Sequence, residues 1–179
     1  MMNKAMIWGL YVSLALIAVT LLFYATGNIL SSVAVYINYL IYIAGIVLVT
    51  QSYKKSVDES TPFPYGKALG LGVATMFYAS IVMAVFTFIL YKFIDPSLID
   101  QFIEYTEDTF LKSGMSEDMV EQYIKLSKPM MTPAVMSMSQ LFSVAFYGFL
   151  ISLITSIFLR KKAETGFDSA MREIDNEEE

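Results

Sequence analysis

The sequence predicts an all-α membrane protein: four transmembrane helices, with an amphipathic helical segment between the third and the fourth. Of the 179 residues, 56% are hydrophobic and only 16% are charged, against about 45–50% and 25% in a typical soluble domain. Charged residues are also absent from three long stretches, 5–53, 68–91 and 129–159. Because a helix needs about 20 apolar residues to cross a bilayer, the first stretch predicts two crossings and each of the others predicts one.

The first two crossings are expected at 6–26 and 33–53. The apolar run after Lys4 exceeds the 7–15 residues typical of a signal peptide, so we expect an uncleaved anchor. Gly27-Asn28 predicts the turn between the two helices, and Ser31 or Ser32 can cap the second.

Asn38 lies among the tyrosines near the start of the second crossing, where Tyr36, Tyr39 and Tyr42 suit an aromatic belt. We expect its amide to bond a neighbouring helix or interfacial water. A contact with a ligand is the alternative.

Small residues recur at helical spacing in the third crossing, 66–92, and in the fourth, 132–159. Such residues let helix backbones approach closely in lipid. The pattern favours packing within the bundle over dimerisation. The residues that we expect at these contacts are Gly66, Gly70 and Ala74 in the third helix and Ala145, Gly148, Ser152 and Ser156 in the fourth.

Two short amphipathic helices are predicted between these crossings, in the segment 95–128. Asp95 can cap the first, with Pro96 at its first position, and Ser113-Gly114 ends it. Ser116 starts the second. Neither is long enough to span, so both should lie on the membrane surface or pack on the bundle end. The apolar faces suggest a surface for a partner, formed by Phe102, Phe110 and Tyr123.

Basic residues predict the topology, because lysine and arginine in short flanking segments mark the cytoplasmic side. One side of the bundle receives Lys4, Lys54, Lys55, Lys67, Arg160, Lys161 and Lys162. Both termini are therefore expected in the cytoplasm, together with the acidic tail 163–179. The segment 95–128 is then external.

Several kinds of chemistry are excluded or disfavoured. The chain has no cysteine and no histidine, so disulfides, thiol chemistry and His or Cys metal sites are excluded. Its net charge of -5 argues against nucleic acid. No motif of a phosphate-binding loop, nucleophile elbow or zinc protease is present. We therefore predict no catalytic, cofactor or metal site.

Two clusters of side chains, one of methionines and one of carboxylates, suggest alternatives to the prediction that the chain has no metal or catalytic site. Thioethers can bind Cu(I), but methionine also fills apolar gaps, and we favour the second reading for Met130, Met131, Met136 and Met138. Carboxylates can hold divalent cations or catalyse hydrolysis if one is buried. A solvated helix face is favoured for Glu104, Glu107, Asp108, Glu117, Asp118 and Glu121.

Two motifs at the ends of the third crossing resemble a family of bacterial membrane proteins. They are Phe63-Pro64-Tyr65-Gly66-Lys67-Ala68 at its entry and Tyr91-Lys92-Phe93-Ile94-Asp95-Pro96 at its exit. The family is found mainly in bacteroidetes and is described only as a domain of unknown function. The resemblance covers nearly the whole chain. It implies four crossings in a bacterial inner membrane, and it carries no catalytic residues.

The leading functional prediction is a non-enzymatic structural or accessory protein of the inner membrane. Its expected partners are the lipid bilayer and another membrane protein or a second copy of the chain. The lack of ionisable residues in the predicted membrane core argues against an ion-coupled transporter acting alone. A component of a small-solute or lipid transporter is the first alternative, and a membrane enzyme acting on lipid-linked substrates is the second.

Overall fold

A computed structural model describes residues 1–57 and 62–160. It confirms the all-α prediction, since four of its helices are long and apolar enough to cross a membrane. The acidic tail 163–179 lies outside the described residues. The helices are α1 (Met2–Ala25), α2 (Ser32–Lys54), α3 (Tyr65–Ile89), the π-helical turn η1 (Leu90–Ile94), α4 (Leu98–Lys112), α5 (Glu117–Ser127), the 3-10 turn η2 (Lys128–Met130) and α6 (Pro133–Leu159).

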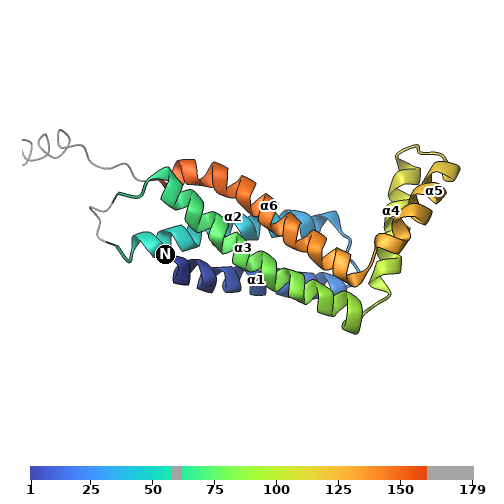
Figure 1. Ribbon diagram of the computed structural model, residues 1–179, viewed down its shortest axis with the longest axis horizontal. Helices are drawn as coiled ribbons and strands as arrows, with labels where there is room; N and C mark the ends of the chain where they lie inside the picture. Colours follow the sequence, from blue (N-terminus) through green and yellow to red (C-terminus); the bar gives the residue numbers. More distant parts are fainter. Residues whose placement is uncertain (58–61, 161–179) are drawn as a thin grey trace, which may run out of the picture.

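The helix α3 is the centre of the bundle. It contacts α1, α2 and α6, and its contact with α6 is the most extensive. The four long helices run side by side along the long axis of the molecule (Figure 1). Their shared core is apolar, and Leu16, Ile46, Met76 and Val144 contribute one side chain from each helix.

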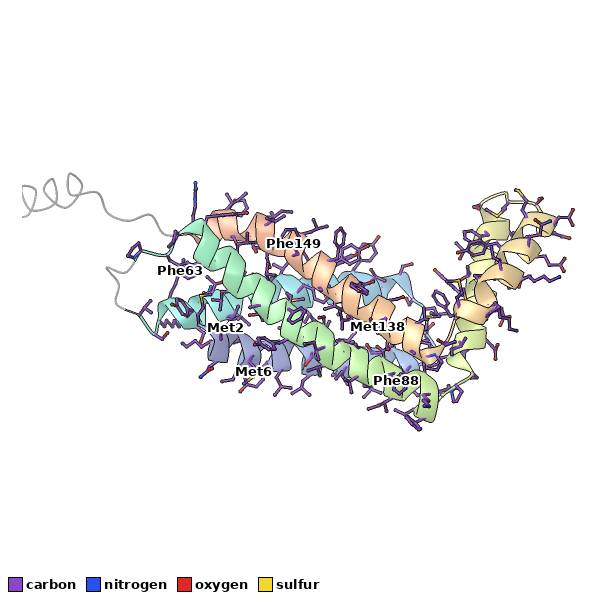
Figure 2. All side chains as sticks on the ribbon, viewed as in Figure 1. Met2, Met6, Phe63, Phe88, Met138 and Phe149 are labelled. Carbon is purple, nitrogen blue, oxygen red and sulfur yellow. The ribbon has the colours of Figure 1, made fainter. Side chains whose placement is uncertain are left out.

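The outer surface of this bundle is also apolar. Side chains project outward along all four long helices, and Met6, Met138 and Phe149 are examples (Figure 2). Met6 and Met138 are each 53% exposed. A soluble monomer rarely exposes apolar patches of more than a few hundred Å², so a surface like this one requires lipid around it.

Local signals explain several helix ends. Ser31 caps α2 as expected, because its hydroxyl accepts a hydrogen bond from the Val33 N–H at 3.3 Å. Gly27 and Gly114 adopt positive φ values of 69° and 90°, which glycine tolerates without strain. The turns predicted at these two positions are therefore present.

The prediction that Asp95 caps α4 is wrong. The π-helical turn η1 extends α3 to Ile94, and the Asp95 N–H donates to the Leu90 carbonyl at 2.8 Å. The Asp95 carboxylate instead accepts from the N–H and the hydroxyl of Ser97. This turn uses Asp95 and Pro96, so α4 begins later, at Leu98.

The helices α4 and α5 form a hairpin that lies across one end of the bundle (Figure 1). The two helices pack on each other, and α5 continues into η2, but neither packs broadly on a membrane-spanning helix. Their contact buries Ile103 and Val120. The hairpin is thus held mainly at its base, where η1 and η2 join it to α3 and α6.

Candidate functional site

The contact between α3 and α6 is a seam of small residues, formed by Gly72 and Met76 on α3 and by Gly148, Ser152 and Ser156 on α6. A Cβ added to Gly148 would lie 2.6 Å from Met76 Cγ, and one added to Gly72 would lie 2.6 Å from Ser152 Oγ. Ser152 and Ser156 are fully buried. The structure therefore places three of the four expected residues of α6, all but Ala145, where two backbones approach closely.

The three expected residues of α3 lie elsewhere. A Cβ on Gly66 would meet nothing within 4 Å, and one on Gly70 would meet only Met1 Cε at 3.8 Å. Ala74 packs against a second core cluster, beside residues such as Leu71. The face of α3 that meets α6 carries Gly72 and Met76. Because residues two apart in a helix are about 200° apart around its axis, this face lies on roughly the opposite side of α3.

Two further glycines serve the packing of α1. A Cβ on Gly9 would lie 2.7 Å from the Thr75 carbonyl oxygen of α3, and one on Gly45 of α2 would overlap the Val12 side chain. Neither glycine was predicted as a packing residue from the sequence. A lone glycine within an apolar helix is the signal that could have marked them, because glycine is costly there unless a neighbour needs the space.

The three residues of the expected partner surface occupy two different places. Phe110 and Tyr123 pack against each other within the hairpin, with ring centroids 4.9 Å apart in an edge-to-face arrangement. Phe102 lies near the base of α4 and faces the end of the bundle, where it lines a cavity. The apolar faces of α4 and α5 thus cover one another along much of the hairpin.

One apolar stripe on α5 is largely uncovered. Met119, Tyr123, Leu126 and Met130 follow at helical spacing and continue from α5 into η2. We call these four residues the α5 stripe. Tyr123 contacts Phe110 of α4 but is still 45% exposed, while Leu126 is 78% exposed and Met130 is 67% exposed.

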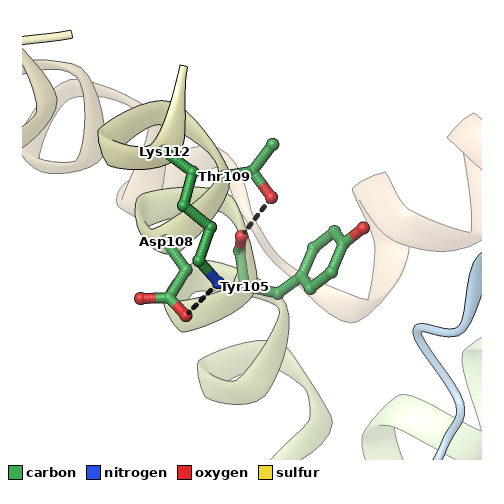
Figure 3. A network of polar contacts seen from close by, with 4 residues as sticks. All are labelled: Tyr105, Asp108, Thr109 and Lys112. Atoms are coloured by element: carbon green, nitrogen blue, oxygen red, sulfur yellow. Dashed lines mark hydrogen bonds and ion pairs between the residues drawn. The ribbon is translucent and has the colours of Figure 1, made fainter. Parts of the chain in front are cut away.

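Charged and polar groups cover the outside of α4. Lys112 Nζ lies 3.3 Å from Asp108 Oδ2, and the Thr109 hydroxyl donates to the Tyr105 carbonyl at 2.7 Å (Figure 3). Exposed pairs of this kind add little to stability. In residues 1–57 and 62–160, no three carboxylates gather closely enough to hold a metal ion.

One carboxylate joins the bundle to the hairpin. The Tyr24 hydroxyl at the end of α1 donates to Asp95 Oδ2 at 3.2 Å. The pKa of the Asp95 carboxyl is lowered, chiefly because the Ser97 hydroxyl donates to it, with help from the Ser97 N–H and from Tyr24. Asp95 therefore stays ionised at neutral pH and fixes the start of the hairpin.

A cavity of about 290 Å³ lies at the same end of the bundle. All four long helices contribute to it, and α4 adds Phe102. No charged side chain is among the described residues that line it. Seven uncharged polar side chains line it, namely Thr20, Asn38, Thr87, Tyr91, Ser139, Gln140 and Ser143.

One polar side chain of this cavity, that of Asn38, is buried without a partner in the described part of the chain. The Asn38 side-chain oxygen is buried with no hydrogen bond among the described residues, so the expected bond to a neighbouring helix is not formed. Thr20 alone bonds its own helix, donating to the Leu16 carbonyl at 2.9 Å. Sequence reasoning singled out only Asn38 here, because the other groups come from helices far apart in the chain.

Comparison with known proteins identifies the family. The sequence model of the family described as Protein of unknown function (DUF4199) matches residues 7–161. The chain belongs to this family. No curated protein and no solved structure matches it.

The matched range of the DUF4199 family includes α2, α3, the α4–α5 hairpin and α6, together with α1 from residue 7 onward. It also includes both motifs that carried the resemblance at the ends of α3. The expectation of a family of unknown function is thereby confirmed. Since the family description supplies no activity, functional inference rests on the hairpin and the cavity.

Proposed function

We propose that this DUF4199 protein is a non-enzymatic accessory protein of a bacterial inner membrane, and that its α4–α5 hairpin binds another membrane protein. One observation carries the proposal: the α5 stripe is exposed on a hairpin that buries other apolar side chains, Ile103 and Val120, in its own core. Exposed apolar patches rimmed by polar residues mark interaction sites. The description of the family assigns no catalytic role to any residue.

Charge favours a protein partner over the lipid surface. The helices α4 and α5 carry seven carboxylates, including Glu104, Asp108 and Glu121, against two lysines. The headgroups of anionic lipids would repel such a hairpin, whereas amphipathic helices that lie on membranes are usually rich in lysine and arginine. The partner that fits is an apolar protein surface with a basic rim.

The topology proposed with this function places both termini in the cytoplasm and the hairpin outside. Lys4 Nζ donates to the Ser52 carbonyl at 2.6 Å, so the start of α1 and the end of α2 share one end of the bundle. Arg160 follows α6 at that end as well (Figure 1). Among the described residues, this end carries the five basic residues Lys4, Lys54, Lys55, Lys67 and Arg160, and Lys161 and Lys162 follow in the sequence. The other end carries the four lysines Lys92, Lys112, Lys125 and Lys128, and the difference supports a cytoplasmic assignment.

Site-specific photocrosslinking in native membranes tests the proposal. A photoreactive amino acid is placed at Leu126 or Tyr123 in the α5 stripe of the full chain. The matched control is Glu121, which is exposed on the same helix but lies on its opposite side. We expect one discrete protein adduct from the stripe positions and none from Glu121.

Three results would contradict the proposal. Adducts with lipid alone would make the stripe a membrane-contacting surface. Adducts with a second copy alone would make it a contact between identical subunits. Equal adducts from Leu126 and Glu121 would show that the hairpin has no specific binding face.

A further inference from the structure

We propose that the cavity at the hairpin end of the bundle is a binding site for a small, uncharged polyhydroxyl group, such as a sugar ring or a glycerol unit. No part of the proposed hairpin function requires this site. The inference rests on the lining of the cavity, on its depth and on its size.

The lining selects for neutral hydrogen-bonding ligands. Asn38 and Gln140 offer amide donors and acceptors, while Thr87, Tyr91, Ser139 and Ser143 offer hydroxyl groups. The Asn38 side-chain oxygen is buried without a hydrogen-bond partner among the described residues, whereas Ser139 and Ser143 are exposed. A buried polar group without a partner is costly, and a hydroxyl group of a ligand could satisfy Asn38 while others bond the neighbouring hydroxyl and amide groups.

Charged ligands are disfavoured by the same lining. The described residues around the cavity include no lysine, arginine, aspartate or glutamate. A phosphate or an ammonium group placed there would lose water without gaining a counter-charge, which is strongly unfavourable. A wholly apolar ligand is equally unsuited, because it would leave the amides of Asn38 and Gln140 unsatisfied.

Apolar side chains frame the polar groups. Met83, Leu90, Phe102 and Met136 line the cavity beside them. Phe102 reaches it from the hairpin, whereas the other three belong to α3, η1 and α6. An apolar frame with a few oriented polar groups is the usual construction of a small-molecule site, and C–H faces of a sugar ring can pack on such side chains.

Depth and size limit the ligand to about one ring. Ser143 lies roughly ten residues into α6, or about 15 Å from its start at a rise of 1.5 Å per residue, so the cavity extends well into the bundle from the hairpin end. Its volume of about 290 Å³ falls just below the range of about 300–1,000 Å³ for sites of drug-sized ligands.

The π-helical turn η1 contributes to this site. Leu90 and Tyr91, which line the cavity, are its first two residues. A π-helical turn adds a residue to the helix and rotates the side chains that follow, and such turns are frequent at functional sites. The turn thus brings Tyr91 to the cavity at the point where α3 ends.

Binding to the full chain in lipid nanodiscs of phosphatidylcholine provides the test, with purification in a detergent that contains no sugar. Glycerol and glucose are titrated by calorimetry as free solutes. A monoglucosyl diacylglycerol is incorporated in the nanodisc as the lipid form, and its retention is measured by native mass spectrometry. Glucose 6-phosphate serves as the charged counterpart of glucose.

The variants Asn38→Leu and Gln140→Leu remove amides from the cavity, and each should weaken binding about tenfold. Gln122→Leu is the matched control, since Gln122 is exposed on α5 and distant from the cavity lining. Thr87→Val removes a hydroxyl group with little change of shape. It replaces the amide variants if circular dichroism shows that they fail to fold.

Two results would support the proposal and identify the source of the ligand. Saturable binding of glucose or glycerol, lost in the cavity variants, indicates a free solute. Retention of the glucolipid alone, with the same dependence on the variants, indicates a lipid headgroup. The proposal is overturned if no probe binds, if the cavity variants bind the probes as tightly as the unmodified chain, or if glucose 6-phosphate binds more tightly than glucose. The cavity is then a water-filled vestibule only.

Discussion

Polar side chains inside this bundle divide into two groups according to what their hydrogen-bonding atoms can reach. The hydroxyl groups of Thr50 and Thr75 each donate to a carbonyl one turn earlier in their own helix, at 2.8 Å. Such a bond satisfies the donor without a neighbouring helix. The Asn38 amide makes no bond of this kind, and its oxygen is buried without a partner. The Ser152 and Ser156 hydroxyl groups also lack partners among the described residues, so Asn38 is distinguished by lining a cavity that a ligand could enter.

Gly148 provides a prediction about the α3–α6 seam. The Gly148→Ala variant should lower the free energy of unfolding by about 1–3 kcal/mol, because the new Cβ would collide with the Met76 side chain. The control is Gly66→Ala, where nothing lies within 4 Å, and alanine should there be neutral or stabilising by about 0.5–1 kcal/mol. Thermal unfolding in detergent measures both, and equal stabilities would mean that α6 does not press on α3 at this position.

Asp95 provides a prediction about pH. Its pKa is lower in the folded protein than its ordinary value of 3.8, so its contribution to stability is present above that value and is lost as the pH falls through the folded pKa. The Ser97→Ala variant removes the main donor and should raise the Asp95 pKa toward 3.8. NMR titration of labelled aspartate checks the shift, with Ser116→Ala as the control. An unchanged Asp95 titration in Ser97→Ala would assign the shift to another cause.

At the scale of elements, the four crossings could be predicted from the sequence. The signal for each crossing, an uncharged apolar stretch, extends over a whole helix. The packing contacts were harder to predict. Gly148, Ser152 and Ser156 lie at the seam, whereas Gly66 and Gly70 have the same kind of spacing and lie outside it. Spacing shows that residues share a face, but it does not show which face meets a neighbour. The cavity could not be predicted at all, because it forms only when separate helices assemble.

The α4–α5 hairpin provides a prediction about an element. Its tip is held by the contact between Phe110 and Tyr123, and an edge-to-face pair adds about 0.5–1.5 kcal/mol beyond burial. The Phe110→Ala variant should therefore speed hydrogen exchange along α5 while exchange in α3 stays slow. Phe93→Ala, which removes a ring that is 68% exposed, should change neither. Slowed or unchanged exchange in α5 of Phe110→Ala would show that other contacts hold the hairpin.

At the scale of the whole molecule, the two ends of the bundle differ in chemistry. One end carries the N-terminus, the end of α6 and most of the basic residues, including Lys4, Lys54 and Arg160 (Figure 1). The other end carries the hairpin and the polar cavity, which share Phe102 as a lining residue. This asymmetry makes the orientation of the chain decisive for its function. In the proposed orientation, both the α5 stripe and the cavity face the outside of the cell.

Cysteine labelling tests that orientation with little background, since the chain contains no cysteine of its own. Ser113 lies at the tip of the hairpin and Ser56 follows α2, and both are exposed. In intact spheroplasts, Ser113→Cys should react with a thiol reagent that cannot cross the membrane, because the segment faces outward. Ser56→Cys should react only after the membrane is permeabilised, and this second step controls for its reactivity. The reverse pattern would place the hairpin in the cytoplasm, where the partner of the α5 stripe and the ligand of the cavity would then have to be sought.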